Sequence, residues 1–309
     1  MTKSMVINID VRDRNDRPVA SVVLESSSTL MDLKKALHRS KPKYYPSRQY
    51  FTLGLGPDRV VLKGDSATLA DLLEPALKSS SSSVTLYFKD LGPQVGWRTV
   101  FFVEYAGPII VHLLVYLCPQ LFYSAPIAHR CLPQKIGFGL VLIHYIKREL
   151  ETAFVHRFSN GTMPLRNIFK NSFHYWGLGG LFIAYFLYHP HYTQGVSDTT
   201  VMVCAAVFVA SMLCNLYTHI ILMRLRPSGS TVRRIPNGFM FELVSCPNYL
   251  FETMAWVSFA VMTCTLTAYF FACVSAGQMY LWAVGKHKAY KKEFGNYPKS
   301  RKAFIPFLL

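Results

Sequence analysis

Ionisable side chains inside stretches that are otherwise apolar are the residues of this sequence best suited to chemistry. Glu104 interrupts one apolar run, and a second run contains the segment HYIKRELE at 144–151. An ionised group near the centre of a bilayer costs about 2.5–3.5 kcal/mol on insertion scales, so such groups are usually paired or face a polar cavity. Both runs are therefore candidates for the wall of an active site.

Helical spacing supplies partners within the second run. Lys147 and Glu151 are spaced i,i+4, Arg148 and Glu151 are spaced i,i+3, and Tyr145 and Glu149 are spaced i,i+4. Two interpretations stay open at this point. In the first, the pairs neutralise one another, or the span ends early and the charges reach the membrane surface. In the second, they line a polar cavity that opens to the cytosol. The acid of the first run favours the cavity, because it needs a donor that Tyr145, Lys147 or Arg148 could provide.

A second group of polar residues follows the later apolar runs. Asn215, His219 and Arg226 fall on one helical face, at offsets of four and seven, shortly before a Gly turn. The block SCPNYLFE at 245–252 precedes a long apolar run, and a basic tail with tyrosines follows it at 285–302. Guanidinium groups at a helix end suit phosphate binding, which predicts a pocket for an anionic ligand. Arginines that only orient the chain in a membrane are the alternative.

The elements that must position these residues are predicted to be membrane spans. The chain is 51% hydrophobic and only 16% charged, with apolar runs at roughly 99–123, 136–155, 172–188, 199–222 and 250–284. The last run exceeds the ~20 residues that cross a bilayer, so we expect it to split near 265–267, giving six spans. Loops on one side carry 14 Lys and Arg and loops on the other carry 2. This bias places both termini in the cytosol.

The first ninety residues are polar and have a different pattern. Alternation predicts strands at 5–11 and 19–25, a helix from Ser28 or Thr29 to Arg39, and further strands at 48–53, 60–62 and 84–89. This order fits a ubiquitin-like β-grasp domain that folds or docks without catalysis. We therefore expect an α+β domain at 1–90 and a multi-pass α-helical membrane domain of about six transmembrane helices at 91–309.

Charge and cysteine content exclude several classes of site. The net charge of +16 resides largely in loops between apolar runs, which indicates membrane orientation and a phosphate site rather than nucleic acid binding. None of the seven cysteines has Cys-x-x-Cys spacing, so we expect buried thiols and no metal site or disulfide. The first ten residues lack the apolar region of a signal peptide, so no cleavable signal is expected.

Five strings give the chain a resemblance to a known family. They are EYAGP at 104–108, HYIKR at 144–148, FVHRFSNGTMPLRNIFK at 154–170, VSCPNY at 244–249 and IPFLL at 305–309. In this order they resemble the steroid 5-alpha-reductase family, and within it the trans-2-enoyl-CoA reductases of microsomal very-long-chain fatty acid elongation. The resemblance covers essentially the whole chain, including the ubiquitin-like part.

The resemblance implies NADPH as the cofactor, held by the part at about 150–309. It implies that the nucleotide is bound by residues at the ends of the later helices: Asn215, Arg226, Arg234, Asn248, Glu252, His287 and Tyr290. His219 and Lys286 depart from the steroid reductases, which carry an acid and a histidine at those positions. The resemblance further implies that Glu104 and Tyr145 meet the substrate carbonyl.

The implied reaction reduces a long-chain trans-2-enoyl-CoA at the endoplasmic reticulum membrane, beside an elongase, a ketoacyl reductase and a dehydratase. It needs a donor for the thioester oxygen and a proton for C2. We expect Tyr145, bonded to Glu104 and made more acidic by Lys147 or Arg148, as the carbonyl donor, with Tyr249 as a rival proton donor. A steroid or polyprenol reductase, a membrane methyltransferase and a non-catalytic scaffold of the elongation complex stay open as alternatives.

Overall fold

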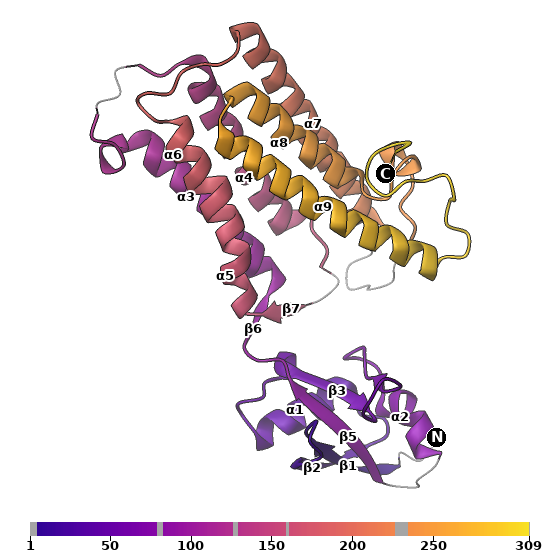
Figure 1. Cartoon of the computed structure of the whole chain (residues 1–309). Helices are drawn as coiled ribbons and strands as arrows, with labels where there is room; N and C mark the ends of the chain where they lie inside the picture. The colour runs from indigo at the N-terminus through magenta and orange to yellow at the C-terminus, as the bar shows by residue number, and fades with distance from the viewer. Residues whose placement is uncertain (1–4, 79–82, 126–128, 159–160, 226–233, 309) are drawn as a thin grey trace. The chain divides into compact units, whose positions relative to one another are not determined.

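The computed structural model describes residues 5–78, 83–125, 129–158, 161–225 and 234–308. The chain forms two compact units. The first comprises Met1–Gly96 with Gly161–Arg166, and the second comprises Trp97–Asn160 with Asn167–Leu309. Figure 1 shows strands concentrated in the first unit and long helices in the second.

The first unit is a five-stranded mixed sheet with the strand order β2-β1-β5-β3-β4. Its elements are β1 (Val6–Arg12), β2 (Pro18–Glu25), α1 (Leu30–Ser40), η1 (Pro46–Arg48), β3 (Gln49–Leu53), β4 (Val60–Val61), α2 (Leu69–Leu77) and β5 (Ser83–Asp90). Alternate residues of β1 are buried against α1, among them Ile7, Ile9 and Val11. The predicted β-grasp order is confirmed, and α2 is a helix that the sequence analysis did not anticipate. A short ladder of β6 (Gln94–Gly96) and β7 (Thr162–Pro164) completes the unit.

Local chemistry explains why α1 begins where the sequence predicts. Thr29 caps the helix by accepting a hydrogen bond from the Asp32 amide, while the Asp32 carboxylate accepts one from the Thr29 amide. Such reciprocal caps satisfy two amides that would otherwise lack partners.

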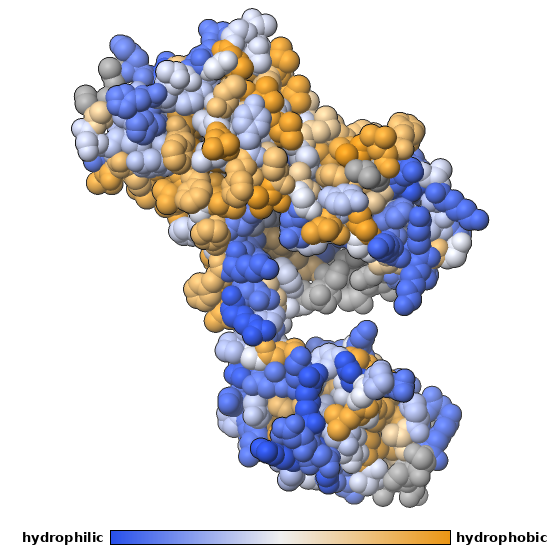
Figure 2. Space-filling model, viewed as in Figure 1, coloured by the Kyte–Doolittle hydropathy of each residue, from blue (hydrophilic) through white to orange (hydrophobic). Residues whose placement is uncertain are grey.

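The second unit is a bundle of packed helices. Its elements are α3 (Trp97–Leu117), η2 (Pro119–Leu121), α4 (Leu132–Phe154), α5 (Arg166–Ser172), η3 (Phe173–Phe182), α6 (Ile183–Leu187), α7 (Asp198–Arg224), η4 (Phe239–Glu242), α8 (Pro247–Thr263) and α9 (Leu266–Glu293). Figure 2 shows hydrophobic residues gathered over these helices and hydrophilic residues at the C-terminal end of α9.

Two helices of the described residues, α3 and α7, are long and apolar enough to cross a bilayer. The membrane character of this unit thus rests on two candidate spans, and six spans are not confirmed. The charged residues of α4 lower its hydropathy, and α8 is only 17 residues long. The predicted split of the last apolar run is confirmed. Cys264 ends α8 in the left-handed conformation, and Thr265 caps α9.

The predicted span at 172–188 contains an unusual helix. The segment η3 is π-helical over ten residues. Such helices are rare and often occur at functional sites. A Cβ atom at Gly180 would lie 3.5 Å from the Pro108 Cα atom of α3 and 3.4 Å from the Val111 Cβ atom. The missing side chain therefore lets η3 pack closely against α3.

Candidate active site

The charged residues of α4 form the ion pairs that their spacing predicts. Lys147 Nζ lies 3.1 Å from Glu151 Oε1, and Arg148 Nη1 lies 2.9 Å from Glu151 Oε2. Glu151 is only 1% exposed. A buried carboxylate is tolerated when cations and hydrogen bonds compensate for its lost hydration, and here both of its oxygens are engaged.

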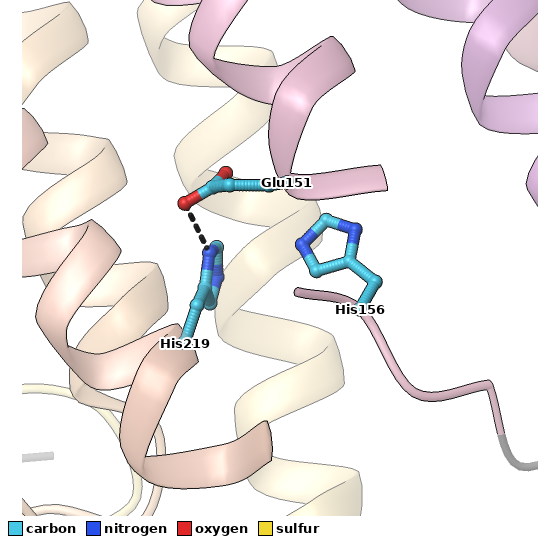
Figure 3. A group of neighbouring side chains, drawn as sticks. All are labelled: Glu151, His156 and His219. Carbon is cyan, nitrogen blue, oxygen red and sulfur yellow. Dashed lines mark hydrogen bonds and ion pairs between the residues drawn. The ribbon is translucent and has the colours of Figure 1, made fainter. Parts of the chain in front are cut away.

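The same acid connects α4 with α7 and, through the amide of Asn215, with α8. His219 Nδ1 lies 2.9 Å from Glu151 Oε1. Figure 3 marks this contact with a dashed line. Lys147 donates to Asn215 Oδ1, and Asn215 Nδ2 donates to the Asn248 carbonyl at 2.8 Å. Residues 147, 215 and 248, which are far apart in the sequence, therefore share one polar network.

A metal ion is a poor fit beside this acid. Glu151, His156 and His219 place their ligand atoms within 4.8 Å of one another (Figure 3). Burial and then the nearby Arg148 cation lower the pKa of His156 to about 3, so its imidazole is neutral and able to bind a metal. However, a divalent cation would stand next to the Lys147 and Arg148 cations, which disfavours it. We interpret the group as part of the polar network.

Tyr145 and Glu104 do not form the predicted hydrogen bond, and that prediction is wrong. The Tyr145 hydroxyl and Glu104 Oε1 are both buried and lack a hydrogen-bond partner among the described residues. The expected Tyr145–Glu149 pair is absent for the same reason. Arg148 instead donates to the Tyr105 hydroxyl at 2.6 Å, with its guanidinium carbon 4.9 Å from the Tyr105 ring centroid.

These unpaired atoms are informative, because buried polar groups almost always have a partner. His144 Nδ1 is a third buried atom without a partner in the described part of the chain. Tyr145 follows His144 directly, and their ring centroids are 5.0 Å apart. A bound ligand with polar atoms would supply the missing hydrogen bonds.

A histidine–acid pair that the sequence analysis did not single out lies beside Tyr145. His144 Nε2 lies 3.1 Å from Glu252 Oε1, and the Trp256 indole donates to the same oxygen at 3.0 Å. His144 stands in the string HYIKR at 144–148. Its position four residues before Arg148 in an apolar helix was the signal that could have identified it.

The C-terminal block forms a separate polar cluster around α9. Lys286 Nζ lies 4.8 Å from the ring centroid of Tyr249. The Ser245 hydroxyl lies 2.6 Å from His287 Nδ1 and 2.6 Å from the Tyr297 hydroxyl. The Tyr290 ring stacks on Tyr297 at 5.5 Å. His287 and Tyr290 are thus brought together, whereas Asn215 and Asn248 belong to the network of Glu151.

Two of the residues predicted to bind the nucleotide are arginines, Arg226 and Arg234. Arg234 is exposed on the loop that precedes η4, where a phosphate could reach it. Arg226, which the sequence analysis placed on one face with Asn215 and His219, lies outside the described residues.

Comparison with known proteins gives matches along the whole chain. Residues 161–309 match the family described as 3-oxo-5-alpha-steroid 4-dehydrogenase, and residues 9–90 match the family described as TECR, ubiquitin-like domain. A very-long-chain enoyl-CoA reductase of Dictyostelium discoideum is 43% identical over 97% of this chain and 98% of its own length. Trans-2,3-enoyl-CoA reductase-like proteins of Mus musculus and Homo sapiens are each 35% identical over 100% of this chain, covering 86% and 85% of their own lengths.

Proposed function

We propose, because this chain belongs to the very-long-chain enoyl-CoA reductase family, that it reduces the C2=C3 double bond of a long-chain trans-2-enoyl-CoA to the saturated acyl-CoA. This is the reductive step that ends a cycle of fatty acid elongation. The structural observation that supports it best is the Tyr145 hydroxyl. Tyr145 is only 1% exposed, and its buried hydroxyl has no hydrogen-bond partner among the described residues. A thioester oxygen would provide that partner.

The reaction needs two functions from side chains. Conjugate addition of hydride at C3 moves negative charge onto the thioester oxygen, so a preorganised donor there lowers the barrier. Tyr145 is the donor we assign, and Glu104 of α3 also has a buried oxygen, Oε1, without a hydrogen-bond partner among the described residues. C2 then takes a proton, for which Tyr145 and Tyr249 are the two candidates. Lys147 and Glu151 connect α4 to Asn215 and His219 of α7, and Arg148 connects it to Tyr105 of α3, so we assign these three residues to holding α4 in place.

The family implies a nicotinamide cofactor, and we propose NADPH, which supplies the hydride when it is bound. The amides of Asn215 and Asn248 and the acid of Glu252 would orient the nucleotide, and the exposed Arg234 would meet a phosphate. Arg226, His287 and Tyr290 complete the proposed set. The Tyr145 hydroxyl, Glu104 Oε1 and His144 Nδ1, which lack partners in the described part of the chain, fit a ligand that carries amide and carbonyl groups.

The setting is proposed from the charge pattern of the loops. Six transmembrane helices, of which α3 and α7 are the apolar pair that the structure supports, would cross the endoplasmic reticulum membrane. Both termini would then lie in the cytosol, with the ubiquitin-like domain. An elongase, a ketoacyl reductase and a dehydratase of the elongation cycle are the proposed partners.

The function is tested by following NADPH oxidation in membranes that contain the full chain. We expect turnover with a long-chain trans-2-enoyl-CoA and a saturated acyl-CoA as the product. A steroid enone and a polyprenol serve as alternative substrates, because the C-terminal match carries a steroid dehydrogenase description. Faster turnover of either would overturn the proposed substrate, and tight S-adenosylmethionine binding would favour a methyltransferase. NADPH binding without turnover of any substrate would favour a scaffold.

Charge reversal on α5 is expected to weaken the binding of the CoA moiety. Arg166 and Lys170 are both exposed, and cations there can bind the CoA phosphates. We expect the double variant Arg166→Glu/Lys170→Glu to raise KM for enoyl-CoA about tenfold, the effect of roughly 1.4 kcal/mol of binding. KM for the corresponding enoyl-pantetheine thioester, which lacks the nucleotide, should not change. Lys63→Glu, an exposed cation of the first unit, is the control, and equal KM effects on both substrates would contradict the prediction.

A further inference from the structure

A buried histidine joins three segments of the helical bundle by two hydrogen bonds. His112 of α3 and Tyr188, which follows α6, are both 0% exposed. His112 Nδ1 lies 2.6 Å from the Tyr188 hydroxyl, and its Nε2 lies 3.1 Å from the Gly179 carbonyl of η3. A carbonyl can only accept, so Nε2 carries the proton and Nδ1 accepts from the tyrosine. Both nitrogens of this neutral imidazole are therefore satisfied.

The carbonyl that His112 holds belongs to the residue that faces the Tyr145 hydroxyl. A Cβ atom at Gly179 would lie 2.9 Å from that hydroxyl oxygen, closer than real Cβ contacts allow. The next nearest atoms belong to the Phe271 ring of α9, at 3.1 and 3.3 Å. Gly179 therefore lies directly beside the Tyr145 hydroxyl. Any side chain at position 179 would displace that hydroxyl or the Phe271 ring.

The π-helical hydrogen bonding of η3 makes the position of Gly179 depend on contacts with other helices. A π-helix is rarely sustained over ten residues, and η3 also contains Gly177 and Gly180, which add little side-chain packing of their own. The bonds from His112 to Gly179 and from Tyr188 to His112 connect this segment to α3 and to the end of α6. These two hydrogen bonds fix the position of η3 at Gly179, the residue that lies beside the Tyr145 hydroxyl.

We propose that Gly179, His112 and Tyr188 are positioning residues for Tyr145. The two hydrogen bonds hold η3 so that Gly179 leaves the Tyr145 hydroxyl free to donate to the substrate carbonyl. The inference rests on the proposed function, in which that hydroxyl binds the thioester oxygen. It assigns a catalytic positioning role to three residues that would otherwise be regarded only as part of the helix packing.

A double-mutant cycle tests the proposal with the full chain in membranes. We expect Gly179→Ala to lower kcat for a long-chain enoyl-CoA on the order of 10- to 10²-fold, because a small misplacement of a reacting group has effects of this size. KM should change less than kcat. In the Tyr145→Phe background the hydroxyl is gone, so Gly179→Ala should have almost no further effect on kcat. Residual rates are measured as acyl-CoA product by mass spectrometry.

Two controls separate positioning from ordinary packing. Phe271→Leu relieves the other close contact of Gly179 but leaves the hydroxyl in place, so Gly179→Ala should still lower kcat in that background. Gly139→Ala on α4, where an added Cβ atom meets nothing within 4 Å, should leave kcat unchanged. An equal loss from Gly179→Ala with and without the Tyr145 hydroxyl would overturn the proposal.

Tyr188→Phe provides a second test in case Gly179→Ala does not fold. It removes only the hydroxyl that bonds His112, and we expect a loss of kcat with KM retained, again absent in the Tyr145→Phe background. Unchanged kcat in a folded Tyr188→Phe variant would refute the role of His112 and Tyr188. Failure of the proposed function is a different result, because wild-type protein would then turn over no enoyl-CoA at all.

Discussion

Tyr145→Phe is expected to lower kcat for a long-chain trans-2-enoyl-CoA by about 10²–10³-fold, the usual effect of removing one donor from a developing oxyanion. The ring remains and continues to pack near His144 and Trp256, at centroid distances of 5.0 and 5.9 Å. The variant should therefore fold and bind the acyl chain. Because the hydroxyl has no partner among the described residues, its removal leaves no other group of the described chain unsatisfied.

Tyr249→Phe discriminates between the two candidate donors. We expect it to be impaired as well, but less than Tyr145→Phe if Tyr145 donates to the carbonyl. Tyr123→Phe is a matched control, since that buried hydroxyl donates to the Tyr185 carbonyl at 2.7 Å and plays no part in the proposed chemistry. It should reduce stability and retain kcat. Turnover close to wild type in both the Tyr145 and the Tyr249 variants would eliminate this assignment.

The site illustrates which contacts a sequence can predict. Lys147–Glu151 and Arg148–Glu151 were predictable, because the geometry of one helix fixes which side chains three and four residues apart are neighbours. The expected bond from Tyr145 to Glu104 was not, since it depends on the relative rotation of α3 and α4. Packing settled that rotation in favour of Arg148 and Tyr105, a partner that spacing along the chain does not reveal.

The fold shows the same division between local and non-local information. Alternation in β1 and the Thr29 cap are local signals, and both predicted their elements correctly. The π-helical conformation of η3 could not be predicted from the sequence, because an apolar run is compatible with several helical hydrogen-bond patterns. His112 was overlooked for a related reason. Its partners, Tyr188 and Gly179, are 76 and 67 residues away and meet it only in the folded bundle.

Glu151→Leu is expected to reduce the free energy of unfolding by about 3–5 kcal/mol, the usual cost of removing one partner from a buried ion pair. Glu151 is 1% exposed and interacts with Lys147, Arg148 and His219. Without it the two cations remain largely shielded from water and repel each other. Thermal and denaturant unfolding of the full chain in detergent would measure the loss.

Glu149→Leu on the same helix is the control, because Glu149 forms no ion pair among the described residues and its buried Oε2 lacks a hydrogen-bond partner. We expect it to be neutral or stabilising. Adding Lys147→Met to Glu151→Leu should recover part of the lost stability, since one unpaired cation is then removed together with its desolvation cost. Equal stability of Glu151→Leu and wild type would mean that the two cations find water or lipid phosphate instead. The acid would then not be the centre that holds α4 against α7.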